Sequence, residues 1–268
     1  MKSQRIISRE YKLVLKAKEF VGEESVLLER STLFWTSLNS VPELKCSGSL
    51  SEPGVRREIR FYDTDDSALY HHNYIFRERK GEEDEKKEIT LKFRHPDRYV
   101  SGDRDMLPKK IGKGSRKFEE DIKRKFQSLY SYSSSQSCKE EQAFERLGDI
   151  SKYYPGIEKD IHHFDKDEKL HIVNSLQIRE LVIKGGEILL CESPGEKAEC
   201  ALIAWYDLGN RGNEPLIVEF SFRYGNKKEN YDREVSQNAY DLFLNIQEKL
   251  DPWLDKDANT KTGFLYAG

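Results

Sequence analysis

Charged residues that could bind phosphate or a metal ion begin almost at the start of this chain. The segment SREYKLVL has a carboxylate at Glu10 and an ammonium at Lys12, which would share one face of a β-strand. Tyr11, Leu13 and Leu15 would share the opposite, apolar face. Taken alone, a charged face of this kind most simply meets water. Whether it has a chemical role depends on whether the alternation recurs along the chain.

The same alternation recurs in the later segments IFRERK, EITLKFRH, KFEEDI and IVEFSFRY. In each, charged or polar residues share a parity and large apolar residues tend to share the other. The polar positions are Arg77, Arg79, Lys92, Arg94, Glu119, Asp121, Glu219, Ser221 and Arg223. Because side chains alternate inward and outward along every strand, such strands could close into an antiparallel barrel with a charged interior. The apolar outer face would then be covered by helices.

A charged interior of this composition predicts phosphoryl-transfer chemistry. Several Arg and Lys side chains in a small volume repel one another unless a polyanion joins them, and phosphate groups match both kinds of cation. Carboxylates on neighbouring strands oppose direct phosphate binding, but they are the ligands that Mg²⁺ takes together with water and substrate phosphates. Bases for the phosphates and acids for the metal together indicate a metal-dependent site.

The composition limits the possible partners. The net charge of −3 gives no general attraction to nucleic acid or to anionic membranes. The basic segment PKKIGKGSRK could contact RNA, but a lone charged loop is usually only solvated, so we expect no nucleic-acid partner. The apolar runs are shorter than a membrane span and the N-terminus does not look like a signal peptide, so we expect a cytoplasmic protein without a membrane partner. The sequence implies no oligomeric state.

The elements that would position the charged residues are mainly strands. About eight strands and three helices follow from the pattern, and most connections are too short for parallel crossovers, which predicts an antiparallel α+β protein in one domain, residues 1–268. The helices are expected in 22–40, in 140–156 and at about 234–250. The stretch 46–54 reads as a loop, the Ser-rich stretch 128–140 as a linker, and Gly185 with Gly186 as a hairpin turn.

The segments SREYKLVL, RFYDTDDSALYHHNYIFRERK, EITLKFRHPDR, SRKFEEDI and PLIVEFSFRY resemble, in order and spacing, the strands of the CYTH domain, or triphosphate tunnel metalloenzyme, superfamily. This superfamily includes thiamine triphosphatase, inorganic triphosphatase, some adenylate cyclases and RNA triphosphatases. The most recognisable piece is FYDTDD followed by FRERK. The resemblance runs from about Ile6 to Tyr224, and the C-terminal helix also fits. It implies a closed eight-stranded antiparallel β-barrel, flanked by helices, whose charged tunnel binds a triphosphate and Mg²⁺ or Mn²⁺.

Position by position, the resemblance implies three groups of site residues. Catalytic roles fall to Lys12, Arg77, Arg79 and Lys92. Further substrate contacts fall to Arg60, Arg94, Arg179, Lys184 and Arg223. Metal ligation falls to Glu10, Glu119, Asp121 and Glu219, although a one-residue slip in FEEDI would bring in Glu120 instead. Ser8 departs from the family, because it stands where the first Glu of the E-x-E-x-K signature is found.

The expected function is therefore divalent-metal-dependent hydrolysis of a triphosphate-containing small molecule, which would be inorganic triphosphate, thiamine triphosphate or a nucleoside triphosphate. The loss of a carboxylate at Ser8 leaves two alternatives open. One is a polyphosphate or nucleotide binding module with weakened catalysis. The other is an adenylate cyclase, in which ATP is the triphosphate and pyrophosphate leaves.

Overall fold

The computed structural model describes residues 4–42, 44–109, 114–193, 195–210, 212–258 and 260–267. The chain divides into two compact units, each assembled from separate stretches. Unit 1 comprises Met1–Ile6, Arg57–Glu120 and Ser128–Ile178, and unit 2 comprises Ile7–Arg56, Asp121–Gln127 and Arg179–Gly268. The strands β2 (Cys46–Asp63) and β5 (Ser115–Lys123) contribute several residues to each unit, and β6 (Gln127–Cys138) and β8 (Ile178–Leu189) each have their first residue in the other unit.

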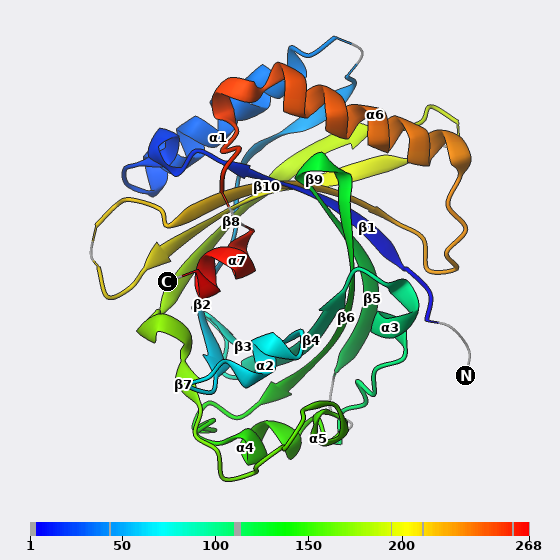
Figure 1. The fold of residues 1–268 in the computed structure, drawn as a ribbon. Coiled ribbons are helices and arrows are strands. Elements are labelled where there is room, and N and C mark those ends of the chain that lie inside the picture. The colour runs from blue at the N-terminus through cyan, green and yellow to red at the C-terminus, as the bar shows by residue number, and fades with distance from the viewer. Residues whose placement is uncertain are drawn as a thin grey trace. The chain divides into compact units, whose positions relative to one another are not determined.

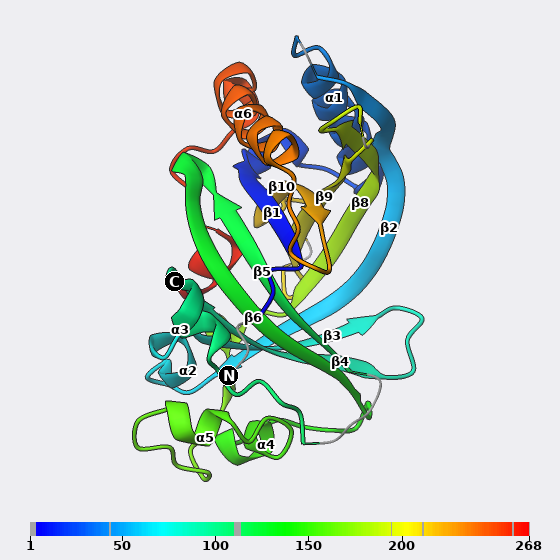
Figure 2. The ribbon, with the colours of Figure 1, turned by 90° about the vertical axis from the view of Figure 1, so that its right-hand side faces the viewer.

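Unit 2 is an antiparallel sheet with helices on one side. Its strands follow the order β1 (Ser8–Leu15), β10 (Ile217–Gly225), β9 (Lys197–Asp207), β8 (Ile178–Leu189) and the first part of β2. Helices α1 (Glu24–Asn39) and α6 (Arg233–Lys249) lie together on one side of β1, β10 and β9 (Figures 1 and 2). The short helix α7 (Lys261–Tyr266) lies on the other side (Figure 1).

The apolar faces of these strands form the core of unit 2. Tyr11 of β1 stacks on Phe222 of β10 with ring centroids 4.6 Å apart, and Phe243 of α6 meets Tyr11 edge-on at 5.3 Å. All three side chains are fully buried, as are Phe34 of α1 and Phe220 of β10. The period of two along the strands and the helical periodicity of α6 therefore converge on one apolar layer.

Unit 1 is also built on antiparallel strands. Its strands follow the order β7 (His171–Ile172), the last part of β2, β3 (Tyr74–Gly81), β4 (Lys87–His95), β6 (Gln127–Cys138) and β5. Its short helices are α2 (Ala68–His71), α3 (Arg98–Gly102), α4 (Leu147–Ser151) and α5 (Ile157–Asp160). Helices α4 and α5 lie on one side of β3 and β4 (Figures 1 and 2), where Phe76 of β3 contacts Phe144 and Tyr154. The described part of the chain also contains four short 3₁₀ segments, Ala17–Phe20, Arg124–Phe126, Val173–Ser175 and Asp251–Trp253.

Two glycine-containing segments were predicted incorrectly, because they lie inside paired strands. The expected loop 46–54 is the first part of β2, and the expected hairpin turn at Gly185 and Gly186 lies within the continuous strand β8. Gly48 and Gly185 have positive φ angles of 71° and 106°. A Cβ on Gly48 would lie only 1.9 Å from the carbonyl oxygen of Gly185, so glycine here permits a close approach of two backbones.

Two further expectations were wrong for a related reason. The Ser-rich stretch 128–140 is not a linker, because most of it forms β6, which pairs with β4 over nine residues from Lys87 to His95. The expected helix in 140–156 is reduced to α4, from Leu147 to Ser151. The other expected strands and the helices near 22–40 and 234–250 are confirmed. The fold is thus α+β with antiparallel strands, and no helix among the described residues is long and apolar enough to cross a membrane.

The core of unit 2 yields a stability prediction. Phe243→Ala should lower the free energy of unfolding by about 3–5 kcal/mol, because it removes a fully buried ring that contacts Tyr11 and Phe222. Leu244 is the matched control, since it is adjacent on α6 but 40% exposed, and Leu244→Ala should change stability by less than about 1 kcal/mol. Urea unfolding measures both. Equal losses for the two variants would contradict the packing described here.

Candidate functional site

The polar face of unit 2 is defined by the register of β1 with β10. Lys12 lies opposite Ser221, and Glu10 lies opposite Arg223. Directly opposed residues of antiparallel strands project to the same side of a sheet, so these four side chains share one face. Glu219, two residues before Ser221, joins the same face, which is the one that carries α7 rather than α1 and α6.

Lys12 links two carboxylates of unit 2. Its Nζ lies 3.0 Å from Oε2 of Glu10 and 2.9 Å from Oδ1 of Asp121. The side chain of Asp121 is only 5% exposed and that of Lys12 only 15%. Burial and the charge of Asp121 favour the neutral form of Glu10, but the attraction of Lys12, with a smaller contribution from Lys261, outweighs them. The pKa of Glu10 is therefore lowered from its ordinary value.

A second buried carboxylate of this face is paired with a residue that the sequence did not indicate. Nζ of Lys261, at the start of α7, lies 2.8 Å from Oε1 of Glu219, whose side chain is 3% exposed. The same ammonium lies 5.5 Å from the centre of the Trp205 ring. The indole Nε1 of Trp205 in turn donates to Oε2 of Glu180 at 2.8 Å, and Glu180 is fully buried. We call Glu10, Asp121 and Glu219 the acidic cluster of unit 2.

A cavity of about 210 Å³ adjoins this cluster. Both Lys12 and Glu219 contribute to its wall, and Thr260, the residue before Lys261, does so too. The remaining charged lining is mostly basic and consists of Lys123, Arg124, Lys125, Lys256 and Asp255. The predominantly positive wall therefore attracts anions, and the cavity reaches the buried carboxylate of Glu219.

The polar face of unit 1 carries a row of basic side chains. Register places Arg77 opposite Thr90, and Lys92 opposite Ser133. Nη2 of Arg77 donates to the hydroxyl of Thr90 at 3.4 Å, and that oxygen lies 2.7 Å from the hydroxyl of Ser135. The four half-buried members of this face are Arg77, Arg79, Lys92 and Arg94, which we call the basic row of unit 1. The serines of β6 border the row with hydroxyl groups, a feature hidden by the interpretation of this stretch as a linker.

Three of the residues expected to contact substrate lie elsewhere. Arg60 is paired in register with Glu78 and contacts it at 3.5 Å, so it lies on the opposite face of unit 1 from the basic row. Arg179 packs over the ring of Tyr206 at 5.0 Å, on the apolar side of unit 2. Lys184 is exposed. Arg223 does lie on the polar face of unit 2, where Nη2 donates to Glu199 at 2.9 Å.

The sequence FEEDI contains three acids, Glu119, Glu120 and Asp121, which differ in their contacts. Asp121 contacts Lys12, whereas Glu120 is buried and accepts a hydrogen bond of 2.7 Å from the hydroxyl of Ser128. Glu119 is half-buried and belongs to unit 1. Asp121 is thus the acid of this strand that joins the acidic cluster of unit 2.

The most recognisable sequence motif has a local structural role. The carboxylate of Asp63, in FYDTDD, is 2% exposed and accepts hydrogen bonds from the backbone N–H groups of Thr64, Leu69 and Tyr70 at 2.8 to 3.0 Å. The Asp63 carboxylate therefore stabilises the turn that connects β2 to α2, and with it the start of the segment that leads to β3.

The carboxylates of this face would offer a divalent ion few protein ligands. Among the described residues, no three His, Cys, Asp or Glu side chains lie close enough to hold a metal together. Glu10 and Asp121 do converge on one cation, since both contact the ammonium of Lys12. Mg²⁺ is commonly held by one or two carboxylates and completes its shell with water and substrate phosphates, so this pair is the best-placed ligand set.

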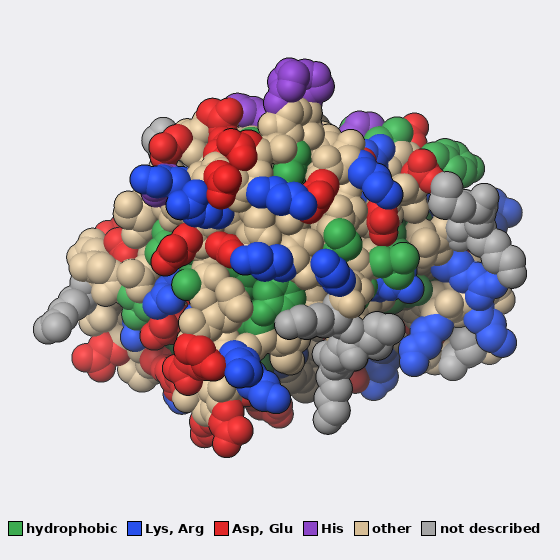
Figure 3. Space-filling view, turned by 90° about the horizontal axis from the view of Figure 1, so that it is seen from below, with side chains coloured by type: hydrophobic (Ala, Val, Ile, Leu, Met, Phe, Trp, Pro, Cys, Tyr) green, Lys and Arg blue, Asp and Glu red, His purple; other side chains and the backbone are tan. Residues whose placement is uncertain are grey.

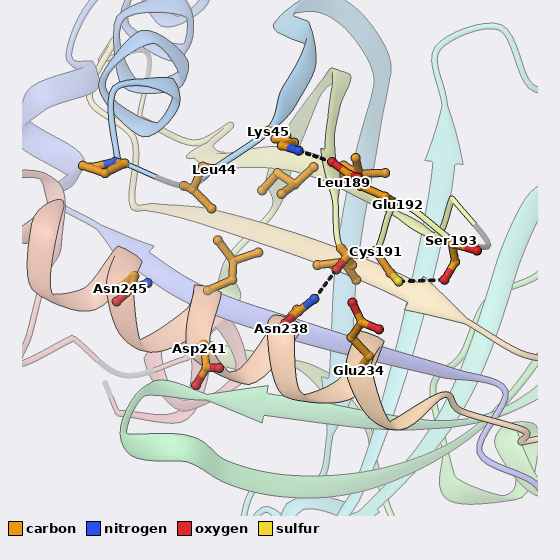
Figure 4. A pocket seen from close by; sticks show the side chains of 14 residues that line it. Leu44, Lys45, Leu189, Cys191, Glu192, Ser193, Glu234, Asn238, Asp241 and Asn245 are labelled. Atoms are coloured by element: carbon orange, nitrogen blue, oxygen red, sulfur yellow. Dashed lines mark hydrogen bonds and ion pairs between the residues drawn. The ribbon is translucent and has the colours of Figure 1, made fainter.

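Other surfaces fit a triphosphate less well. A cavity of about 480 Å³ lies between α6 and the end of β8, on the apolar side of the unit 2 strands (Figure 4). Its charged side chains are mainly acidic, namely Glu192, Glu234 and Asp241 with Lys45. On the face in Figure 3, acidic and basic side chains are interspersed at the centre, while basic side chains gather along the right-hand edge. The basic segment 108–117 lies partly outside the described residues, which omit 110–113.

Comparisons with known proteins give structural likenesses only. No protein-family model and no curated protein matches the chain. A protein from Hippeastrum, described as a candidate adenylyl cyclase with dominant triphosphatase activity, matches with 13% identity over 97% of this chain and 95% of its own, at a TM-score of 0.47. Candidate adenylate cyclases from Vibrio parahaemolyticus (10% identity, 98% and 99% coverage, TM-score 0.37) and Bacillus halodurans (11%, 97% and 97%, 0.41) also match. At these scores the likenesses establish neither family nor function.

The geometry around Lys12 predicts a change in the titration of Glu10. Lys12→Ala should raise the pKa of Glu10 above its ordinary value, because burial and the charge of Asp121 would then prevail. In the native protein the lowered pKa contributes stability that is present above the ordinary pKa and lost as the pH falls through the folded-state value. The stability difference between the two proteins should therefore be largest near neutral pH and shrink in acid.

Carboxyl NMR titration and urea unfolding at several pH values measure these effects. Lys16→Ala is the control, since Lys16 also belongs to this region but its Nζ donates to the carbonyl of Pro252 at 2.8 Å, away from the cluster. An unchanged Glu10 titration in Lys12→Ala would show that Lys12 does not govern this carboxylate.

Proposed function

We propose that this protein is a divalent-metal-dependent hydrolase of a triphosphate-containing small molecule. The observation that carries the proposal is the pair of carboxylates on the ammonium of Lys12, buried Asp121 and half-buried Glu10, next to a small cavity with a mostly basic wall. Such a combination serves a substrate that brings several negative charges together with a metal ion.

The basic row of unit 1 would bind the phosphate groups. Arg77 and Arg79 project from the same face of β3, and Lys92 projects from that face on β4. An arginine guanidinium can donate two parallel hydrogen bonds to two oxygens of one phosphate, while a lysine ammonium acts as a point charge. The hydrogen bond from Arg77 to Thr90 limits the freedom of one guanidinium before substrate binds. Lys12 would supply a further positive charge on unit 2.

Mg²⁺ or Mn²⁺, when bound, would polarise the terminal phosphoryl group as a Lewis acid. Glu10 and Asp121 are its best-placed ligands, with Glu219 as a third candidate on the same polar face. Ser8, at the start of β1, stands where the CYTH superfamily has the first Glu of its E-x-E-x-K signature. A hydroxyl in place of that carboxylate would lower the number of strong metal ligands. Glu119 stays a prediction from the sequence.

The proposal retains a closed antiparallel barrel and a relation to the CYTH superfamily, but the described residues form ten strands, β1 to β10, instead of the eight predicted from the sequence. Antiparallel pairing and the separation of polar from apolar faces within each unit are what such a barrel requires.

A binding module with weakened catalysis is the second candidate, and the observation that favours it is Ser8 in place of a carboxylate. Phosphate release from inorganic triphosphate with Mg²⁺ or Mn²⁺ separates the candidates, when it is compared with binding of the same compound in EDTA. Binding without turnover favours the module. Incubation with ATP followed by product analysis separates phosphate release, expected for a hydrolase, from the cyclic AMP and pyrophosphate of a cyclase.

The basic row yields a prediction about turnover. Arg79→Ala should reduce the rate of hydrolysis of inorganic triphosphate by about 10²-fold or more. The substitution removes a guanidinium whose positive charge would stabilise the negative charge of the phosphates in the transition state. The fold should persist, since the side chain belongs to a polar face. Lys80→Ala is the matched control: Lys80 follows Arg79 on β3, projects to the other side and pairs with Glu140. A rate in Arg79→Ala equal to that of Lys80→Ala would refute the assignment of Arg79.

A further inference from the structure

Basic residues outside the basic row and the acidic cluster make up part of the wall of the cavity of about 210 Å³. Lys123, Arg124 and Lys125 come from the end of β5 and the connection to β6, and Lys256 comes from the segment that follows the 3₁₀ turn Asp251–Trp253. Every lining residue of this cavity belongs to unit 2. Cations from two segments that are far apart in the sequence therefore line one small volume.

A hydrogen bond joins the two segments at the cavity wall. Nη1 of Arg124, a half-buried residue, donates to the backbone carbonyl of Lys256. The backbone N–H of Asp255 donates to the carbonyl of Val14 on β1 at 3.0 Å. These contacts fix the guanidinium of Arg124 and the backbone of residues 255–256 relative to β1, so this part of the wall is formed before any ligand binds.

The turn Arg124–Phe126 has an unusual backbone. Lys125 and Phe126 have positive φ angles of 61° and 54°, which residues other than glycine rarely adopt. Contacts with α6 support this conformation: the N–H of Lys125 donates to Oε1 of Gln247 at 3.3 Å, and the rings of Phe126 and Tyr240 meet with centroids 4.7 Å apart. The turn lies beside α6 in Figures 1 and 2. Strained residues that are held by their surroundings are concentrated at functional sites, and here they belong to the most basic part of the cavity wall.

The acidic residues of the same wall are engaged by other groups. Glu219 contacts the ammonium of Lys261 at 2.8 Å. Oδ1 of Asp255 accepts hydrogen bonds from the backbone N–H groups of Asp257 and Ala258 at 3.2 and 3.0 Å. Basic residues outnumber acidic ones among the described lining residues, so an anion can meet the cations directly, without a bridging metal ion.

The lining also indicates the class of anion. Several cations around a small volume favour a multiply charged anion, and an arginine next to lysines suits the oxygens of phosphate groups. The described lining residues include no aromatic side chain, so the cavity offers no ring on which a nucleobase or another aromatic group could stack. The cavity therefore fits an inorganic phosphate compound better than an organic one.

We propose that this cavity binds an inorganic polyphosphate anion, of which pyrophosphate is the smallest, through Arg124, Lys125 and Lys256 and without a metal ion. The inference goes beyond the proposed function, because these three residues belong neither to the basic row nor to the acidic cluster. Lys12 lines the same cavity and contacts Asp121, so an anion bound here lies beside the acidic cluster.

The test measures pyrophosphate binding by calorimetry in EDTA. The background is the Arg79→Ala protein, in which the basic row is weakened as a competing site for phosphate. Arg124→Gln in this background should lower the affinity about tenfold, because it removes a charge-assisted contact with the anion. Lys125→Gln changes an exposed side chain, so it should leave the melting temperature unchanged and lower the affinity about threefold.

Lys16→Gln is the matched control. It removes the same charge from a residue that does not line the cavity and whose Nζ donates to the carbonyl of Pro252 at 2.8 Å. Its affinity for pyrophosphate should equal that of the background protein. Equal affinities in the Arg124→Gln, Lys125→Gln and Lys16→Gln proteins, or pyrophosphate binding that appears only when Mg²⁺ is added, would overturn the inference.

ADP distinguishes an inorganic ligand from a nucleotide, because it carries the same diphosphate on an aromatic nucleoside. ADP should bind no more tightly than pyrophosphate. Tighter binding of ADP that is lost in Arg124→Gln would show that the cavity accommodates a nucleoside and would overturn the assignment of an inorganic ligand. Absent hydrolysis of triphosphates with intact, variant-dependent pyrophosphate binding would refute the proposed function and leave this inference standing.

Discussion

Neutralisation of buried carboxylates is the constraint on which the polar faces of this protein depend. A buried carboxylate is stable only with a cation or with several hydrogen-bond donors nearby. In unit 2, Lys12 meets this need for Glu10 and Asp121, and Lys261 meets it for Glu219. In unit 1, Glu78 is 4% exposed and contacts both Arg60 and Lys87.

The charged residues of unit 1 lie on two faces, and the two faces differ in how many of their basic side chains pair with buried carboxylates. Glu78 lies on the side of unit 1 that packs against Tyr154 and Phe144, so its two cations serve the fold. The basic row occupies the other side, with Glu88 directly opposite Arg79 and serine hydroxyls along β6. The alternation of side chains along each strand thus places the charged residues that pair within the unit on one face and the basic row on the other. Arg60 illustrates the distinction, because its type suggested a phosphate contact and its parity places it with Glu78.

The sequence revealed the strands wherever polar and apolar residues alternate. Glu10, Lys12, Arg77, Arg79 and Lys92 could be placed correctly on their strand faces because a period of two needs no knowledge of distant contacts. Segments 46–54 and 128–140 were misassigned because Gly, Pro and Ser are poor strand formers by themselves. Their strand conformation comes from pairing with partners far away in the chain, as between β6 and β4.

The missed residues of the site depend on the same kind of contact. Lys261 lies more than forty positions beyond Glu219, in a six-residue helix whose sequence signals only its N-cap at Thr260. Trp205 and Glu180 gave a weak signal: Trp205 shares the parity of Glu199 on β9, and Glu180 shares its parity on β8 with the apolar residues Ile178 and Val182. A buried acid in an apolar strand must have a partner, so Glu180 could have been recognised as part of a network, although not as a support for the indole beneath Lys261. The position of a buried carboxylate can thus be predicted from the alternation of residues in its own strand. Its counter-ion cannot, because that residue comes from an element that is distant in the sequence.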